Sequence, residues 1–266
     1  MWSSRSKGLV LPDVNRLLAV ASTPRTGSNL LCRGLGATGL VPTPDEWLVE
    51  KQLARWEGSR PLGRPLLHRR MVRRAGRTLG VERLASVSRY ARAPLERYLV
   101  ERSRAEQSMD GTASIKVMWS MYFDFLVQAD LGFHSLSQPV VWVRTRRADR
   151  LRQAVSLARA LTSQQWGSTS TPVRAVEFDA ALIERCLGSI EYGERGWDSY
   201  FASHRIDPFE VVYEDLDRDY EAVMAAVFRH CDIDAAVPAR QLERQADATT
   251  EEWIARYRSE RGAGRR

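Results

Sequence analysis

The chain has 266 residues, a formal net charge of +7, 44% hydrophobic residues and 27% charged residues, which is ordinary for a globular protein of one large or two small domains. No run of about 18 apolar residues occurs, which excludes a membrane span, and the three cysteines lack metal-site spacing, which favours a reducing cytoplasm. The basic excess is almost entirely arginine, a residue that grips phosphate with paired hydrogen bonds, so an anionic ligand is plausible.

The first predicted element is a strand, a turn and a helix over residues 16–38. Residues 1–15 are predicted to be a mobile leader, and their short, interrupted apolar patch argues against a signal peptide. Residues 17–21 are an apolar run typical of a buried strand, and a helix pattern follows from Ser28, its predicted N-cap. The predicted inward positions of this helix are Leu30, Leu31, Leu35 and Ala37.

The turn between this strand and helix carries one cation, Arg25. Backbone N–H groups and the dipole at a helix N-terminus favour an anion. The turn lacks the first glycine and the Gly-Lys-Ser/Thr sequence of a Walker A loop. It therefore predicts a phosphate or sulfate site formed by Arg25 with the Thr26 and Ser28 hydroxyls, in a geometry other than that of ATP or GTP.

Further strands and helices alternate along the rest of the chain. Residues 40–113 are the least regular part, and the arginine-dense segment 64–104 is predicted to form solvated helices. Strands are predicted at 114–119, 139–144 and 208–213, and helices at about 121–131, 149–165, 179–203 and 217–231. Such alternation is typical of an α/β domain with a central parallel sheet flanked by helices, here over residues 16–260, with a basic tail at 261–266.

A second basic turn follows the third strand, where Arg144, Arg146 and Arg147 occur within four residues. Ser156 lies two to three turns down the next helix. Because ligands of parallel sheets sit at the carboxyl ends of strands, the two basic turns are expected at one edge. They predict a ligand with two separated anionic groups.

Three segments, in order, resemble the sulfotransferases that use 3′-phosphoadenosine-5′-phosphosulfate (PAPS): residues 23–28, Arg147 with Ser156, and the sequence Tyr-Glu-Asp-Leu at 213–216. The resemblance implies a P-loop-like three-layer sandwich, PAPS as co-substrate, adenosine 3′,5′-bisphosphate as product, and no metal. It assigns the 3′-phosphate to Arg147, or alternatively Arg146, together with Ser156. The remaining implied donor contacts are Pro24, Arg25, Thr26, Gly27, Ser28, Asn29 and Tyr213.

The similarity is closer to the bacterial trehalose 2-sulfotransferase group, through residues 116–119, 153–156, 242–247 and 252–258. It implies a small-molecule hydroxyl acceptor that contains a sugar, nucleotide contacts from Arg244 and Gln245, and a homodimer. The similarity covers about 16–48 and 110–260. It fails at 49–109, which is interpreted as a helical insertion on the acceptor side.

The general base is inferred from a departure from the wider family. Many sulfotransferases carry Lys-x-His on the second strand, whereas this chain has Lys116 followed two residues later by Met118. In the trehalose group a glutamate after the first helix resembles the base, and Glu46 matches it, with Asp45 as the rival. A carboxylate at that place could take the acceptor's proton. Lys116 is assigned to the transferring sulfuryl group or the bridging oxygen, alongside Arg25.

Two other classes of function fit some features of the sequence. A nucleotide-dependent kinase of P-loop architecture would fit the strand–turn–helix, but the Walker A residues are missing. A nucleic-acid-binding protein would fit the charge of +7, but the arginines are spread along the chain and no nucleic-acid motif occurs.

Overall fold

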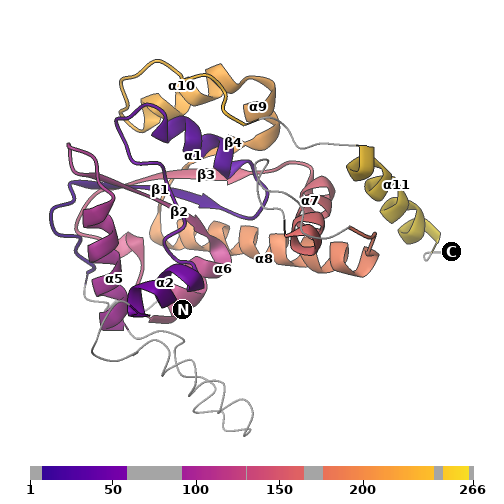
Figure 1. Ribbon diagram of the computed structural model, residues 1–266, viewed down its shortest axis with the longest axis horizontal. Coiled ribbons are helices and arrows are strands. Elements are labelled where there is room, and N and C mark those ends of the chain that lie inside the picture. Colours follow the sequence, from indigo (N-terminus) through magenta and orange to yellow (C-terminus); the bar gives the residue numbers. More distant parts are fainter. Residues whose placement is uncertain (1–7, 59–91, 130, 165–175, 243–247, 264–266) are drawn as a thin grey trace, which may run out of the picture.

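A parallel four-stranded sheet forms the centre of the computed structural model, which describes residues 8–58, 92–129, 131–164, 176–242 and 248–263. The strands are β1 (Arg16–Ser22), β2 (Thr112–Met118), β3 (Val140–Arg146) and β4 (Phe209–Val212). Their order across the sheet is β2-β1-β3-β4, and every neighbouring pair is parallel (Figure 1). The predicted strands and the parallel sheet are confirmed.

Helices cover both faces of this sheet (Figure 1). On one side lie α1 (Ser28–Gly36), α9 (Tyr213–Arg218) and α10 (Tyr220–His230). On the other lie α2 (Glu50–Gly58), α5 (Arg92–Ala105), α6 (Trp119–Met121) and the long α8 (Ala180–His204). Helix α7 (Arg150–Ser163) packs on α8, and α11 (Ala248–Ala263) packs on α7. The predicted three-layer α/β sandwich is therefore confirmed.

Alternation along β1 explains why both faces must be covered. Leu17, Ala19 and Ala21 point into one buried cluster with Trp197 of α8. Leu18 and Val20 point into the other, with the apolar residues of α1 and α10. A strand that is apolar on both faces requires a helix layer on each side, which is the arrangement observed.

The predicted mobile leader is wrong for the part of it that the structure describes. Leu9, Leu11 and Val14 are buried in the main core, and Leu9 forms a parallel bridge with Leu136. These apolar side chains gain more from burial than the segment loses in chain freedom. Residues 1–7 and 264–266 lie outside the described residues.

The solvated helices predicted at 64–104 need a similar correction. Helix α5 buries Leu95, Tyr98 and Leu99 in the main core, and Tyr98 donates a hydrogen bond to the backbone oxygen of Trp47. The described part of this segment is therefore a structural part of the domain. Residues 59–91 lie outside the described residues.

Several predicted element ends also shift. Gly27, with φ 76°, is the N-cap of α1 in place of Ser28, and Ala37 is an exposed C-cap. The helix predicted at 121–131 is broken into α6, a π-helical turn (Tyr122–Leu126) and a 3-10 turn (Val127–Ala129). Strand β4 ends at Val212, so Tyr213 begins a helix, because its polar successors suit a first turn.

Two stacked histidines predict a pH dependence of the stability of the fold. The rings of His134 and His204 lie 3.7 Å apart at 8°, and burial lowers the pKa of His204. The unfolded chain therefore binds a proton on His204 more tightly than the folded chain does. The neutral, buried imidazole contributes its full stability above the unfolded pKa of about 6.5. This contribution is lost as the pH falls below that value. We expect the free energy of unfolding, measured in urea, to fall below pH 6.5, and the fall to be smaller in His204→Gln. An unchanged pH dependence in this variant would contradict the expectation.

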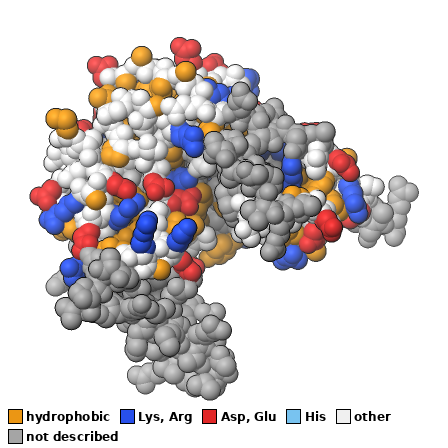
Figure 2. Space-filling view, in the orientation of Figure 1, with side chains coloured by type: hydrophobic (Ala, Val, Ile, Leu, Met, Phe, Trp, Pro, Cys, Tyr) orange, Lys and Arg blue, Asp and Glu red, His pale blue; other side chains and the backbone are white. Residues whose placement is uncertain are grey.

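Charged side chains of both signs are mixed on the face shown in Figure 2. Many arginines are in ion pairs, such as Arg152 with Glu251 and Arg240 with Asp217. Part of the arginine excess therefore forms ion pairs between segments that are distant in the sequence. In the described part of the chain, no helix is both long and apolar enough to cross a membrane.

Candidate active site

The turn after β1 leads directly into the first turn of α1, at the carboxyl end of the sheet (Figure 1). Arg25 and Gly27 both have left-handed backbones, with φ 67° and 76°. The Thr26 hydroxyl donates to the Thr23 backbone oxygen at 3.0 Å and lies 2.7 Å from the Thr145 hydroxyl. This buried hydroxyl therefore braces the loop, which corrects the prediction that it faces an anion, and leaves the first-turn N–H groups for that role.

Gly27 is required by a close approach to Tyr213. A Cβ atom at position 27 would lie 2.4 Å from Cδ2 of the Tyr213 ring. We expect Gly27→Ala to lower the free energy of unfolding by more than the roughly 1–2 kcal/mol of a left-handed alanine, because the ring must also move. Gly39→Ala is the matched control, since Gly39 has φ 72° with nothing within 4 Å. Equal losses in urea denaturation would show that the ring contact contributes nothing.

The structure brings together four residues that were predicted from three separate segments: Arg25, Ser156, Arg147 and Tyr213. Arg25 Nε donates to Ser156 Oγ at 2.9 Å, and Arg147 Nη1 donates to the backbone oxygen of Arg25 at 3.3 Å. The Arg147 guanidinium lies 4.6 Å from the centre of the Tyr213 ring. Arg147 Nε also lies 3.6 Å from a carboxylate oxygen of Glu214.

The electrostatics of this cluster favour an anion. Burial, and then the charge of Arg147, lowers the pKa of Arg25. Burial likewise lowers the pKa of Arg147, despite the opposing effect of Tyr213 and Glu214. Both positive charges are thus disfavoured by their surroundings, and an anion beside them would offset that cost.

The other two arginines of the second basic turn do not join this cluster. Arg144 pairs with Glu194, Asp198 and Glu210 at 3.1, 2.6 and 3.5 Å. Arg146 pairs with Glu194 and Glu210 at 3.2 and 3.3 Å. Although burial opposes it, these carboxylates raise the pKa of Arg146. The prediction of a three-arginine anion site is therefore wrong. Strand β3 extends to Arg146, and because side chains alternate along a strand, Arg144 and Arg146 share one face, where both contact Glu194.

A second cluster of polar side chains consists of Lys116, Asn29 and Glu46. Lys116 Nζ lies 3.0 Å from Glu46 Oε1 and donates to Asn29 Oδ1 at 2.6 Å. The backbone explains this geometry, because Lys116 N–H donates to the Asp45 backbone oxygen at 2.9 Å, so the segment around Asp45 runs along the edge of β2. Asn29 lies in the first turn of α1, which connects this group to the Arg25 loop.

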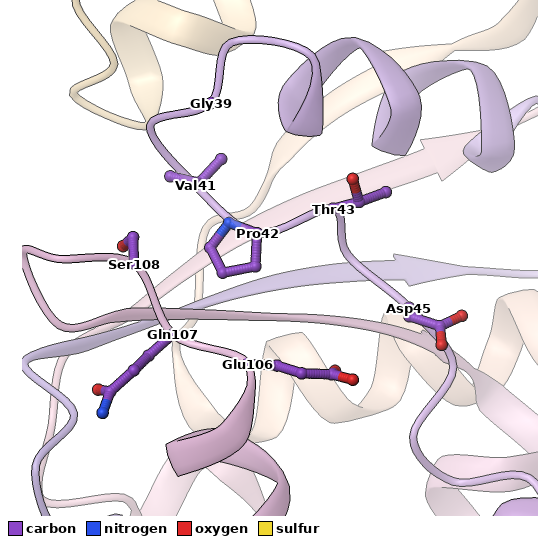
Figure 3. Close-up of a pocket in the computed structure, with 8 residues that line it drawn as sticks. All are labelled: Gly39, Val41, Pro42, Thr43, Asp45, Glu106, Gln107 and Ser108. Atoms are coloured by element: carbon purple, nitrogen blue, oxygen red, sulfur yellow. The ribbon is translucent and has the colours of Figure 1, made fainter.

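Asp45 points away from Lys116. Its carboxylate lies 3.9 Å from Arg102 and accepts a hydrogen bond from Gln52 at 3.4 Å. It lines an open pocket of about 390 Å³ together with Glu106, Gln107 and Ser108 (Figure 3). Neighbouring residues on an extended segment face opposite ways, so Glu46 rather than Asp45 lies at the lysine.

Two predicted donor contacts, Arg244 and Gln245, lie outside the described residues. Pro24 and Ser28 are in the loop and at the start of α1, where predicted. Within the ranges that the structure describes, no group of three or more His, Cys, Asp or Glu side chains could hold a metal ion.

Comparison with known proteins identifies the class of enzyme. The model of the Stf0 sulphotransferase family matches residues 18–260. The chain belongs to this family. It is therefore a sulfotransferase, as the resemblance implied. This assignment favours the sulfotransferase hypothesis over the hypothesis of a nucleotide-dependent kinase.

Similar proteins agree with the assignment. A trehalose 2-sulfotransferase of Mycolicibacterium smegmatis is 27% identical over 90% of this chain and 93% of its own length. One of Mycobacterium tuberculosis is 36% identical over 45% of this chain and 46% of its own length. The sulfotransferase domain of the olefin synthase of Synechococcus PCC 7002 shares the fold, with a TM-score of 0.50 and 17% identity over 92% of this chain and 88% of that one.

Sequence reasoning missed the polar residues beneath the Arg25 loop. Glu194 of α8 accepts a hydrogen bond from Thr23, and Gln153 of α7 donates to Thr23 and to the backbone oxygen of Pro24. Gln153 lies in a stretch that resembles the trehalose group, which was the available signal. Glu194 lies in an ordinary amphipathic helix pattern, so no sequence signal marked it.

Proposed function

We propose that this sulfotransferase moves a sulfuryl group from PAPS to a hydroxyl of a sugar-containing small molecule. The observation that carries the proposal is the pairing of Arg25 and Arg147 at a helix N-terminus, with both charges disfavoured by their surroundings. PAPS has two separated anionic groups, and one arginine for each group matches this pair.

In the proposed complex the loop from Pro24 to Asn29 binds the 5′-phosphosulfate through its N–H groups and Arg25. Arg147 and Ser156 bind the 3′-phosphate. The Ser156 hydroxyl accepts a hydrogen bond from Arg25 Nε, so its own proton is available to a phosphate oxygen. Tyr213 fixes the Arg147 guanidinium from its ring face. Arg244 and Gln245 stay predicted nucleotide contacts.

The reaction is an in-line displacement at sulfur. An acceptor hydroxyl oxygen forms the new O–S bond, its proton passes to the Glu46 carboxylate, and the bond from sulfur to the bridging oxygen breaks. The leaving phosphate oxygen keeps the electron pair, and Arg25 and Lys116 stabilise its charge. The 3.0 Å contact of Lys116 and Glu46 places base and cation side by side.

The acceptor class comes from the relatives named as trehalose 2-sulfotransferases. We therefore propose a trehalose-like sugar or glycoconjugate as acceptor, approaching from the Glu46 side, where the segment 49–109 contributes to the site. The homodimer and the cytoplasmic location stay predictions, as does the absence of a required metal.

Nucleotide binding tests the proposal. We expect adenosine 3′,5′-bisphosphate to raise the melting temperature more than AMP or ATP does, because only the bisphosphate places phosphates at both arginines. A ligand at about a hundred times its Kd adds roughly 2.7 kcal/mol to the free energy of unfolding. Equal shifts for AMP and the bisphosphate would remove the 3′-phosphate site from the proposal.

A further inference from the structure

Helix α8 packs closely against the end of β1, beneath the Arg25 loop. A Cβ atom on Gly193 would lie 2.8 Å from Cγ2 of Thr23, so the helix can approach only because that residue has no side chain. One turn on, the buried Trp197 donates its indole N–H to the backbone oxygen of Ser22 at 2.9 Å. This contact brings one face of α8 to the residues that precede the loop.

Glu194 is the polar residue on this face, and its side chain is only 7% exposed. Its Oε1 accepts a hydrogen bond from the Thr23 hydroxyl at 2.7 Å. The same Thr23 oxygen accepts from Gln153 Nε2 at 3.0 Å, and that nitrogen also donates to the Pro24 backbone oxygen at 2.7 Å. Side chains from α7 and α8 thus hold the two residues directly before Arg25.

The other carboxylate oxygen of Glu194 binds three guanidinium groups. Oε2 lies 3.1 Å from Arg144 Nη2, 3.2 Å from Arg146 Nε and 3.2 Å from Arg150 Nη2. A buried carboxylate is strongly attracted to guanidinium groups in direct contact with it. These three arginines are therefore held on the α8 side, whereas Arg25 and Arg147 remain on the loop side.

We propose that Glu194 is a positioning residue of the sulfuryl-donor site, an inference that rests on the function proposed above. One carboxylate oxygen fixes the loop through Thr23, and the other keeps three neighbouring arginines away from the donor. Glu194 touches neither donor nor acceptor in this proposal, so it acts on transfer only through the positions of Arg25 and of these three arginines.

The backbone of Arg25 makes this support necessary. Its φ of 67° is unfavourable for a residue with a side chain, so the loop relaxes when its anchors are removed. A relaxed loop still offers N–H groups to an anion but misplaces the Arg25 guanidinium. Misplacement reduces the rate of transfer more than it reduces nucleotide binding, because Arg147 continues to bind the 3′-phosphate.

Two variants test the proposal, each with a matched control. Glu194→Gln removes the negative charge with little change in shape, and Thr23→Val removes the loop contact while leaving Glu194 and its arginines in place. Glu191→Gln is the control on the exposed side of α8, where Glu191 pairs only loosely with Arg195 at 3.7 Å. Thr162→Val is the second control, since that hydroxyl bonds Ala158 within its own helix.

The measurements are the melting temperature, kcat and KM for PAPS, and the affinity for adenosine 3′,5′-bisphosphate by calorimetry. We expect folded Thr23→Val and Glu194→Gln to lose about 10- to 100-fold in kcat, with a smaller change in bisphosphate affinity and unchanged values in both controls. If Glu194→Gln does not fold, Thr23→Val decides. A folded Thr23→Val with the kcat of the unmodified protein overturns the proposal, because a merely structural role would lower the melting temperature alone.

Failure of the proposed function would be separately visible. If the unmodified protein transfers no sulfuryl group from PAPS, that function fails, and the loop is then tested with pyrophosphate as an anion probe. Weaker pyrophosphate binding by Thr23→Val than by Thr162→Val would support the positioning of the loop by Glu194 and Thr23. Equal binding would overturn it.

Discussion

Replacing Glu46 with glutamine should slow sulfuryl transfer by roughly 10²–10⁴-fold, the usual scale for loss of a general base. The amide keeps the shape of the side chain but cannot take the acceptor's proton. Affinity for adenosine 3′,5′-bisphosphate should be nearly unchanged, because the Arg25 and Arg147 groups lie on other elements. Single-turnover transfer and calorimetric binding measure the two effects separately.

Asp45→Asn is the matched control for this experiment. Asp45 is adjacent in sequence, yet its carboxylate faces Arg102 and the open pocket of Figure 3. Its variant should transfer at close to the rate of the unmodified protein. Loss in Asp45→Asn with normal transfer in Glu46→Gln would move the base by one residue. Normal transfer in both would place the base elsewhere, with the segment 49–109 as the first region to search.

Replacing Arg147 with alanine should weaken bisphosphate binding by about 1.5–3 kcal/mol, the cost of one charge-assisted contact. AMP binding should change much less, because AMP lacks the 3′-phosphate. The variant should therefore discriminate poorly between the two nucleotides. Calorimetric titration of both nucleotides into the variant measures this loss directly.

Arg146→Ala is the control for the register of the basic turn. Arg146 is bound to Glu194 and Glu210, so its loss should leave the preference for the bisphosphate intact. Retained preference in Arg147→Ala, with loss in Arg146→Ala, would assign the 3′-phosphate to the other arginine. The observed pairing of Arg146 with carboxylates makes that result contrary to expectation.

The fold was predictable because its signals are local. Buried parallel strands are short apolar runs, and residues 17–21 could be interpreted without any knowledge of their neighbours. Sequence motifs marked Arg25 and Ser156, and the structure brings them within 2.9 Å although 131 positions separate them. The carboxyl-end rule for parallel sheets brings such residues together.

The remaining features depend on packing between distant elements. Whether Arg146 or Arg147 faces the loop depends on where β3 ends, and strand ends are poorly marked in sequence. The Thr26 hydroxyl was misassigned because its partner, Thr145, lies on another strand. Glu194 is a buried carboxylate in an ordinary helix pattern, and only the tertiary structure shows its contacts with Thr23 and three arginines.

The most direct test of the proposed reaction is to incubate the protein with PAPS and a panel of sugars, including trehalose, and follow both products by mass spectrometry. We predict that adenosine 3′,5′-bisphosphate and one sulfated sugar appear in equal amounts, and that Glu46→Gln suppresses both. Release of bisphosphate with no sulfated hydroxyl compound, or no consumption of PAPS with any sugar in the panel, would contradict sulfuryl transfer from PAPS to a sugar.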